Sequence, residues 1–173
     1  AHEVGGEFGR HSASYTPLVA SAFSKALRRA VPDPTGVLVD IGAGRGRCII
    51  LALAHGFQNA VGIEHSAELC RSARSNLAIA GLPGGEIWEA DASATSLPPE
   101  TKVISMYNPF TPTVWKSVLE GPIAALDRPV TVLAHAMPHA ATVHSPHVRV
   151  EHDRTIWAHG RDFIVLRVAP RHE

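Results

Sequence analysis

Cysteine is scarce in this sequence, since only Cys48 and Cys70 occur among 173 residues. Both fall in segments with helical periodicity, so we expect reduced thiols that pack as small hydrophobic side chains, which excludes a disulfide framework. An excess of one charge is also missing, because 16 Lys and Arg balance 16 Asp and Glu. The positive excess typical of proteins that bind phosphate backbones is absent, which disfavours nucleic acid as a partner.

Long apolar runs are lacking too. None approaches the ~18 residues that a membrane span needs, and no basic stretch followed by an apolar segment resembles a secretory signal. We therefore expect no membrane partner and a cytoplasmic protein.

Apolar residues instead alternate between helical and strand periodicity along the chain. Thr16 and Pro17 have the form of an N-cap and a first helical residue. The expected strands are Val37–Ile41, Ala60–Glu64, Glu86–Ala90, Val103–Tyr107 and Val130–Ala134, and the expected helices are Cys48–Ala54, the segment between Ser66 and Gly81, and Pro112–Leu119 after a Thr111 cap. This alternation predicts an α/β fold with a mostly parallel sheet covered on both faces.

The end of the chain has a different pattern. Val148–His152 and Asp162–Val168 read as two strands with His159 and Gly160 between them and no clear helix. The sheet should therefore close with a C-terminal antiparallel hairpin. The length fits a single domain, 1–173, whose expected parts are a flexible arm or lid (1–15), an N-terminal helix (16–31) and the sheet (36–173).

Three glycines at alternate positions, Gly42, Gly44 and Gly46, follow the first expected strand. Such strand-to-helix turns serve nucleotides, because glycine accepts unusual dihedrals and lets a ligand touch the main chain. The dinucleotide fingerprint G-x-G-x-x-G/A would put Arg47 at its last small position, and Asp40 at the strand end would repel a diphosphate. The turn thus favours a smaller, cationic ligand.

On Asp40 and these glycines the chain resembles the class I S-adenosylmethionine-dependent methyltransferases, from the turn through the fifth strand. The resemblance implies a Rossmann-like class I methyltransferase fold, S-adenosyl-L-methionine as cofactor and S-adenosyl-L-homocysteine as product. In that family an acid like Glu64 accepts the ribose hydroxyls, while Asp91 and the N–H of Ala92 contact the adenine. The residues expected at the cofactor are Asp40, Gly42, Ala43, Gly44, Gly46, Glu64, His65, Asp91, Ala92, Asn108 and Tyr15.

The segment Tyr107-Asn108-Pro109-Phe110 follows the fourth strand. It resembles the N/D-P-P-Y/F motif of methyltransferases that modify planar or amino nitrogens, with one proline in place of two. The resemblance implies that the Asn108 side chain accepts hydrogen bonds from substrate N–H groups and that Phe110 stacks on the acceptor. Positioning alone can supply ~7–11 kcal/mol.

His135, directly after the fifth strand, is the best placed general base, because imidazole titrates near neutral pH. The expected catalytic residues are Asn108, Pro109, Phe110 and His135. The expected reaction is methyl transfer to a small-molecule or protein acceptor, at nitrogen.

Several alternatives stay open. An NAD(P)-dependent reductase is opposed by Arg47 and by the Asn-Pro-Phe element, and a non-catalytic cofactor-binding module can be excluded only by turnover. Asp91 could simply cap a turn or helix, and Asn108 with Pro109 could form a strand-ending turn before Thr111.

Two further segments carry hypotheses. Phe8-Gly9 and Tyr15-Thr16-Pro17 are loosely similar to the start of a bacterial group of small methyltransferases, so Phe8, Arg10 and Tyr15 could form a lid over the cofactor, or a disordered terminus. Histidines are crowded in one stretch, at His135, His139, His144 and His147. Because Pro138 and Pro146 break the helix that would align them, we expect a polar loop beside the substrate pocket and no metal site.

Overall fold

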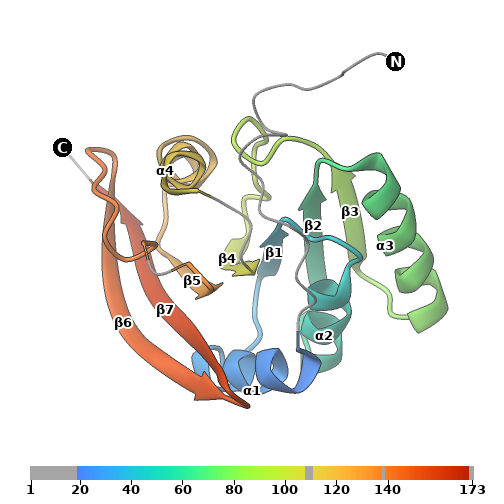
Figure 1. Cartoon of the computed structure of the whole chain (residues 1–173). Coiled ribbons are helices and arrows are strands. Elements are labelled where there is room, and N and C mark those ends of the chain that lie inside the picture. Colours follow the sequence, from blue (N-terminus) through green and yellow to red (C-terminus); the bar gives the residue numbers. More distant parts are fainter. Residues whose placement is uncertain (1–18, 108–110, 138, 172–173) are drawn as a thin grey trace.

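The computed structural model describes residues 19–107, 111–137 and 139–171. Its seven strands join one sheet in the order β3-β2-β1-β4-β5-β7-β6 (Figure 1). Their bounds are β1 Val37–Ile41, β2 Asn59–Glu64, β3 Gly85–Glu89, β4 Thr101–Tyr107, β5 Val130–His135, β6 Val148–Ala158 and β7 Arg161–Pro170. The first five strands pair in parallel, and β7 pairs antiparallel with both β5 and β6. The predicted α/β fold, with a mostly parallel sheet and a C-terminal antiparallel hairpin, is confirmed.

Helices cover both faces of the sheet. They are α1 Ala20–Ala30, α2 Arg47–His55, α3 Ala67–Ala80 and α4 Pro112–Val118, which continues into a π-helical turn, Leu119–Ile123, and a 3-10 turn, Ala124–Leu126. Side chains of α1, α2 and α3 build one hydrophobic core, and those of α4 and the turns after it build a second core on the other face. The sheet is therefore the middle layer of three.

Local signals fix where the chain leaves the sheet. Ser66 Oγ accepts the N–H of Leu69 at 3.4 Å and begins α3, while Gly81 ends that helix with a φ of 63°. Thr111 is the N-cap of α4. These helix boundaries agree with the capping pattern of the sequence. They place the segments after β2 and β4 at the carboxyl edge of the sheet, where ligands of open α/β folds bind.

Two boundaries differ from the sequence-based expectation by more than two residues. Helix α1 begins only at Ala20, after an extended Val19 that makes no side-chain cap, and Thr16 and Pro17 lie outside the described residues. Strand β6 runs to Ala158, six residues beyond the expected end. A register shift between His152 and Arg154 interrupts the alternation of side chains between the two faces of β6. Because the strand was predicted from that alternation alone, its predicted end falls at the shift.

Both cysteines are buried and free, as expected. Within the three described ranges no helix is long and apolar enough to cross a membrane.

Candidate active site

The glycine turn between β1 and α2 is held open by its backbone conformation. Gly42, Gly44 and Gly46 all have positive φ, at 79°, 55° and 76°. The N–H groups of Gly42 and Ala43 both donate to the Ile63 carbonyl on β2, at 2.9 and 3.1 Å. The turn is therefore tied to the neighbouring strand, and its main chain can lie against a ligand because glycine accepts these dihedrals.

Glu64, the last residue of β2, faces this turn. Its Oε2 accepts the Gly44 N–H at 2.9 Å and its Oε1 accepts the Ser66 N–H at 2.9 Å. His65 Nδ1 lies 3.2 Å from Oε1, and the Glu64 side chain is 5% exposed. An ionised carboxylate has about four acceptor positions, so Glu64, which accepts two backbone N–H groups and lies beside His65, still has acceptor capacity at Oε2 for a ribose hydroxyl. The structure thus brings Gly44, Glu64 and His65 together, and their contact with a cofactor stays a prediction.

Asp40 lies behind the turn in β1 and is only 4% exposed. Burial raises the pKa of Asp40 from 3.8 to about 6, hydrogen bonds with the Ser105 and Cys48 side chains oppose that rise, and the nearby Glu64 adds to it. Cys48 Sγ lies 3.1 Å from Ser105 Oγ, so the three side chains form one buried polar group. Two buried carboxylates beside one glycine turn suit a cationic ligand and oppose a diphosphate. The residues present therefore fit S-adenosylmethionine better than a nicotinamide dinucleotide.

The residue at the last position of the dinucleotide fingerprint also indicates that the turn does not suit a nicotinamide dinucleotide. Arg47 is exposed at the first position of α2. The close approach between the turn and α3 falls one residue earlier, because a Cβ built on Gly46 would lie 3.1 Å from the Ala73 Cβ.

Asp91 and Ala92 follow β3. Asp91 Oδ1 accepts both the N–H and the Oγ–H of Ser93, at 2.7 and 2.8 Å, and Ala92 is buried. The turn-capping alternative therefore describes the contacts that Asp91 makes here. Because both contacts use Oδ1, the second carboxylate oxygen is not engaged by Ser93, and the adenine contact stays a prediction.

Aromatic rings meet at the carboxyl ends of β4 and β5. Tyr107 and His135 are register partners at the last positions of these strands. Their ring centroids lie 4.4 Å apart at 31°, and the Phe163 ring from β7 lies 5.0 Å from His135. His135 Nδ1 is 2.6 Å from the Asp162 carbonyl oxygen. A carbonyl can only accept, so Nδ1 carries the proton and Nε2 of the neutral ring is the acceptor.

The sequence alone did not single out Phe163, Asp162 or Ser105 for this region. Phe163 and Asp162 reach His135 only through the antiparallel pairing of β5 with β7, and sequence periodicity does not give that register. Other predicted residues, namely Tyr15, Asn108, Pro109 and Phe110, lie outside the described residues, as do Phe8 and Arg10 of the proposed lid.

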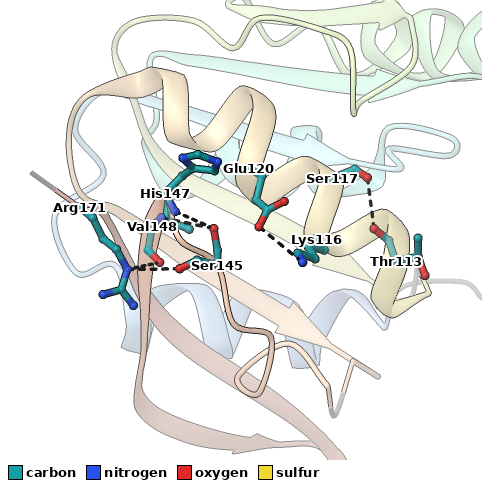
Figure 2. Close-up of polar contacts among 8 residues, drawn as sticks. All are labelled: Thr113, Lys116, Ser117, Glu120, Ser145, His147, Val148 and Arg171. Atoms are coloured by element: carbon teal, nitrogen blue, oxygen red, sulfur yellow. Dashed lines mark hydrogen bonds and ion pairs between the residues drawn. The ribbon is translucent and has the colours of Figure 1, made fainter. Parts of the chain in front are cut away.

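The histidine-rich segment after β5 is anchored by its backbone. Ser145 Oγ accepts the N–H groups of His147 and Val148 at 3.1 and 3.4 Å (Figure 2). Arg171 Nε, just after β7, donates to the carbonyls of Ser145 and Val148 at 3.2 and 3.3 Å (Figure 2). Further back in this segment, His139 Nε2 is buried without a hydrogen-bond partner in the described structure, and burial lowers the pKa of His139. No group of three or more His, Cys, Asp or Glu side chains in the described ranges could hold a metal ion.

A polar cavity of about 340 Å³ lies at the opposite edge, where Thr35, Gly36 and Gln58 contribute to its walls. That edge holds the amino ends of β1 and β2. Because ligands of open α/β sheets bind at the carboxyl ends, this cavity is separate from the candidate site.

No protein-family model matches the chain, and no curated protein matches it by sequence. Solved structures do match. An RNA methyltransferase from Salinibacter ruber, in complex with S-adenosyl-L-homocysteine, is 27% identical with a TM-score of 0.66, over 91% of this chain and 97% of that chain. TrmN from Thermus thermophilus is 20% identical with a TM-score of 0.65, over 92% of this chain and 50% of that chain. The 23S rRNA methyltransferase ErmE is 18% identical with a TM-score of 0.60, over 87% of this chain and 68% of that chain.

These likenesses correct one expectation from the sequence. The balanced charge disfavoured nucleic acid as a partner, and that prediction is wrong, because proteins described as RNA and rRNA methyltransferases are among the similar structures. Net charge is a sum over the whole chain and does not report how charges are distributed on the surface. The sheet order, the glycine turn beside two buried carboxylates and the likeness to a methyltransferase solved with S-adenosylhomocysteine agree with one another. Together they place the chain among the class I S-adenosylmethionine-dependent methyltransferases.

Proposed function

We propose that this protein transfers a methyl group from S-adenosylmethionine to a base nitrogen in RNA. The observation that carries the RNA acceptor is the 27% identity to the Salinibacter ruber RNA methyltransferase, which extends over nearly the whole of both chains. The likeness to TrmN and ErmE is lower in identity and supports only the fold. Nitrogen as the methylated atom rests on the sequence motif that begins at Asn108.

The residues that we propose to hold the cofactor are Glu64, Asp91 and Asp40. When bound, S-adenosylmethionine supplies an electrophilic methyl group on a positively charged sulfur. Glu64, held by the Gly44 and Ser66 N–H groups, would accept the ribose hydroxyls. Asp91 would contact the adenine amino group through the oxygen that Ser93 does not engage, and the negative charge of Asp40 behind the turn would favour the cation.

The acceptor end would be formed at the ends of β4 and β5. Unpaired RNA bases are planar and stack on aromatic side chains, and we propose that Phe110 supplies this contact while Asn108 holds the base by its N–H groups. His135 then has a specific role. Its Nδ1 proton is held by the Asp162 carbonyl, which leaves Nε2 free to accept a proton from the acceptor nitrogen.

Two measurements test the proposal in order. The first is calorimetric titration with S-adenosylhomocysteine, with NAD as the comparison ligand and Gly44→Arg as the negative control. We expect S-adenosylhomocysteine to bind with a Kd on the order of micromolar, as is typical of enzyme ligands. The Gly44→Arg variant should lose this binding because the arginine side chain would fill the turn. Binding of NAD alone would contradict the cofactor assignment.

The second measurement is transfer of tritium from methyl-labelled S-adenosylmethionine to total bacterial RNA. Label that is released by ribonuclease but not by protease would support an RNA acceptor, and mass spectrometry of the nucleosides would identify the methylated atom. Label confined to protein, or a methyl group on ribose oxygen, would refute the corresponding part of the proposal.

The His135 role has its own test. His135→Ala should lower kcat by about 10²-fold or more and change the pH dependence of kcat. An unchanged rate with an unchanged pH profile would show that His135 is not the proton acceptor.

A further inference from the structure

Helix α1 carries positive charge only. Its charged residues are Lys25, Arg28 and Arg29, and the helix contains no Asp or Glu. These residues stand at i, i+3 and i+4, so their side chains are neighbours on the helix surface. Both arginines are exposed and Lys25 is half-buried. The buried side of the helix is formed by Ala22, Phe23, Ala26 and Leu27. The three cations therefore lie together outside the side that packs on the core.

No acidic side chain balances these three charges. Like charges at this spacing repel one another and destabilise a helix. The helix dipole offsets part of the repulsion at Arg28 and Arg29, which lie in the last turn, but Lys25 lies a turn earlier. Within residues 19–107, 111–137 and 139–171, the ion pairs of lysine and arginine are instead those of Lys116, Arg149 and Arg154. An anionic partner on α1 would relieve this repulsion.

Strand register adds Arg161 to the same surface. Arg161 is exposed and pairs with Ala158, a residue of the core that α1 helps to build. Since paired residues of neighbouring strands point to the same face, Arg161 lies on the α1 side of the sheet. Arg29 Nη1 lies 3.5 Å from the carbonyl oxygen of Trp157, the residue before Ala158, and the tip of the hairpin lies beside α1 (Figure 1). We call Lys25, Arg28, Arg29 and Arg161 the α1 basic surface.

The α1 basic surface borders the proposed acceptor end. Arg161 stands two residues before Phe163 in β7 and on the same face, about 7 Å along the strand. Phe163 is the register partner of His135, and their rings lie 5.0 Å apart. The Phe163 ring also lies 6.3 Å from the ring of Phe23, on the buried side of α1. A strand of RNA that delivers a base to His135 would therefore pass close to these cations.

The chemistry of the α1 basic surface fits an anionic polymer better than a membrane. Helices that lie on membranes place large apolar side chains next to their cations. The large hydrophobic side chains exposed in the described structure are Ile79 and Trp157, and neither belongs to this surface. Trp157 pairs with Asp162, and because side chains alternate along a strand, both point to the opposite face of the hairpin. The four cations suit phosphates, which they can contact whatever the base sequence.

We propose that the α1 basic surface binds the phosphate backbone of RNA next to the nucleotide that is methylated. This proposal rests on the RNA acceptor proposed above. It assigns the positioning of the RNA strand to α1 and the hairpin tip, and it leaves recognition of the base to the acceptor end.

The experiment is fluorescence anisotropy of a fluorescein-labelled, single-stranded decauridylate with the full chain, over a series of salt concentrations. Arg28→Gln/Arg161→Gln removes one charge from the helix and one from the hairpin, and neither side chain forms an ion pair or hydrogen bond in the described part of the chain. The variant should bind more weakly at low salt. Its slope of log Kd against log salt should fall by about 1.4, because each phosphate contact to a single strand contributes about 0.7.

Two further variants control for net charge and for folding. Lys102→Gln/Arg128→Gln removes the same charge from two exposed residues at the amino ends of β4 and β5, and it should keep the wild-type slope. Arg28→Lys/Arg161→Lys keeps both charges and should keep most of the affinity. An unchanged slope in Arg28→Gln/Arg161→Gln, an equal loss in Lys102→Gln/Arg128→Gln, or a wild type that does not bind would overturn the proposal.

Parallel measurements separate this proposal from the proposed function. If the wild type methylates RNA and Arg28→Gln/Arg161→Gln leaves KM for RNA unchanged, the α1 basic surface has no role in RNA binding and the function stands. If binding depends on the surface and no RNA is methylated, the phosphate contact stands and the RNA acceptor is wrong. Vesicles that contain phosphatidylserine test the other anionic partner. If the wild type binds them in place of RNA and the variant does not, the surface belongs to a membrane contact and RNA binding is refuted.

Discussion

The substitution Asp40→Asn tests the physical account of the site at its most buried charge. The pKa of Asp40 is raised from 3.8 to about 6, chiefly by burial. One pKa unit corresponds to about 1.4 kcal/mol, so the ionised carboxylate costs the folded state about 3 kcal/mol. The carboxyl group is protonated in both states at low pH and imposes no cost there. As pH rises, the unfolded chain ionises first, so stability falls through the range between the two pKa values and the loss is complete above the folded pKa.

Asparagine never ionises, so the variant should gain stability relative to the wild type as pH increases. From about pH 5 to about pH 7.5 the difference in free energy of unfolding should widen by about 1.4 kcal/mol in favour of Asp40→Asn. Altered hydrogen bonds with Ser105 and Cys48 add an offset that does not depend on pH. Urea unfolding followed by circular dichroism measures both proteins, with Asp33→Asn as the control because Asp33 is exposed. A difference that stays constant or narrows with pH would refute the reasoning.

Other predictions concern the glycine turn and the thiols. Gly46→Ala should lower the free energy of unfolding by about 2–4 kcal/mol, because positive φ and a Cβ 3.1 Å from the Ala73 Cβ both oppose it. Gly81→Ala, with positive φ but open space around it, should cost only about 1 kcal/mol in the same urea assay, and equal losses would contradict the crowding argument. Cys48 and Cys70 are buried, and burial raises the pKa of the Cys48 thiol well above its usual value. Neither should react with Ellman's reagent until urea unfolds the chain, and rapid labelling of the folded protein would contradict this burial.

The parts of the structure that were predictable from sequence are those that depend on local chemistry. Ser66 and Thr111 cap helices because their hydroxyl oxygens accept backbone N–H groups a few residues away. The turn from Gly42 to Gly46 was predictable because glycine readily adopts positive φ angles, which residues with a Cβ resist. In the same way the sequence predicted that the second strand ends at Glu64, next to that turn.

The rest depended on register and on charge distribution. The contact between His135 and Asp162 requires a particular antiparallel alignment of β5 with β7. The full length of β6 was missed because a shifted register at Asp153 breaks the alternation. The prediction that nucleic acid is an unlikely partner came from the net charge of zero. That sum includes ion pairs that cancel locally, such as Arg149 with Glu151. It does not report where a single charge lies, such as that of Arg29 beside Trp157.

The position of β6 at the end of the sheet has a consequence for the behaviour of the protein at high concentration. An end strand of eleven residues offers unpaired backbone groups that could recruit the same strand from another molecule. Here the middle of that strand carries Glu151, Asp153 and Arg154, all exposed, and its register is shifted at the same place. A second strand pairing there would have to bury these charges and match an irregular backbone. The feature that concealed the strand in the sequence thus also protects it from edge-to-edge aggregation.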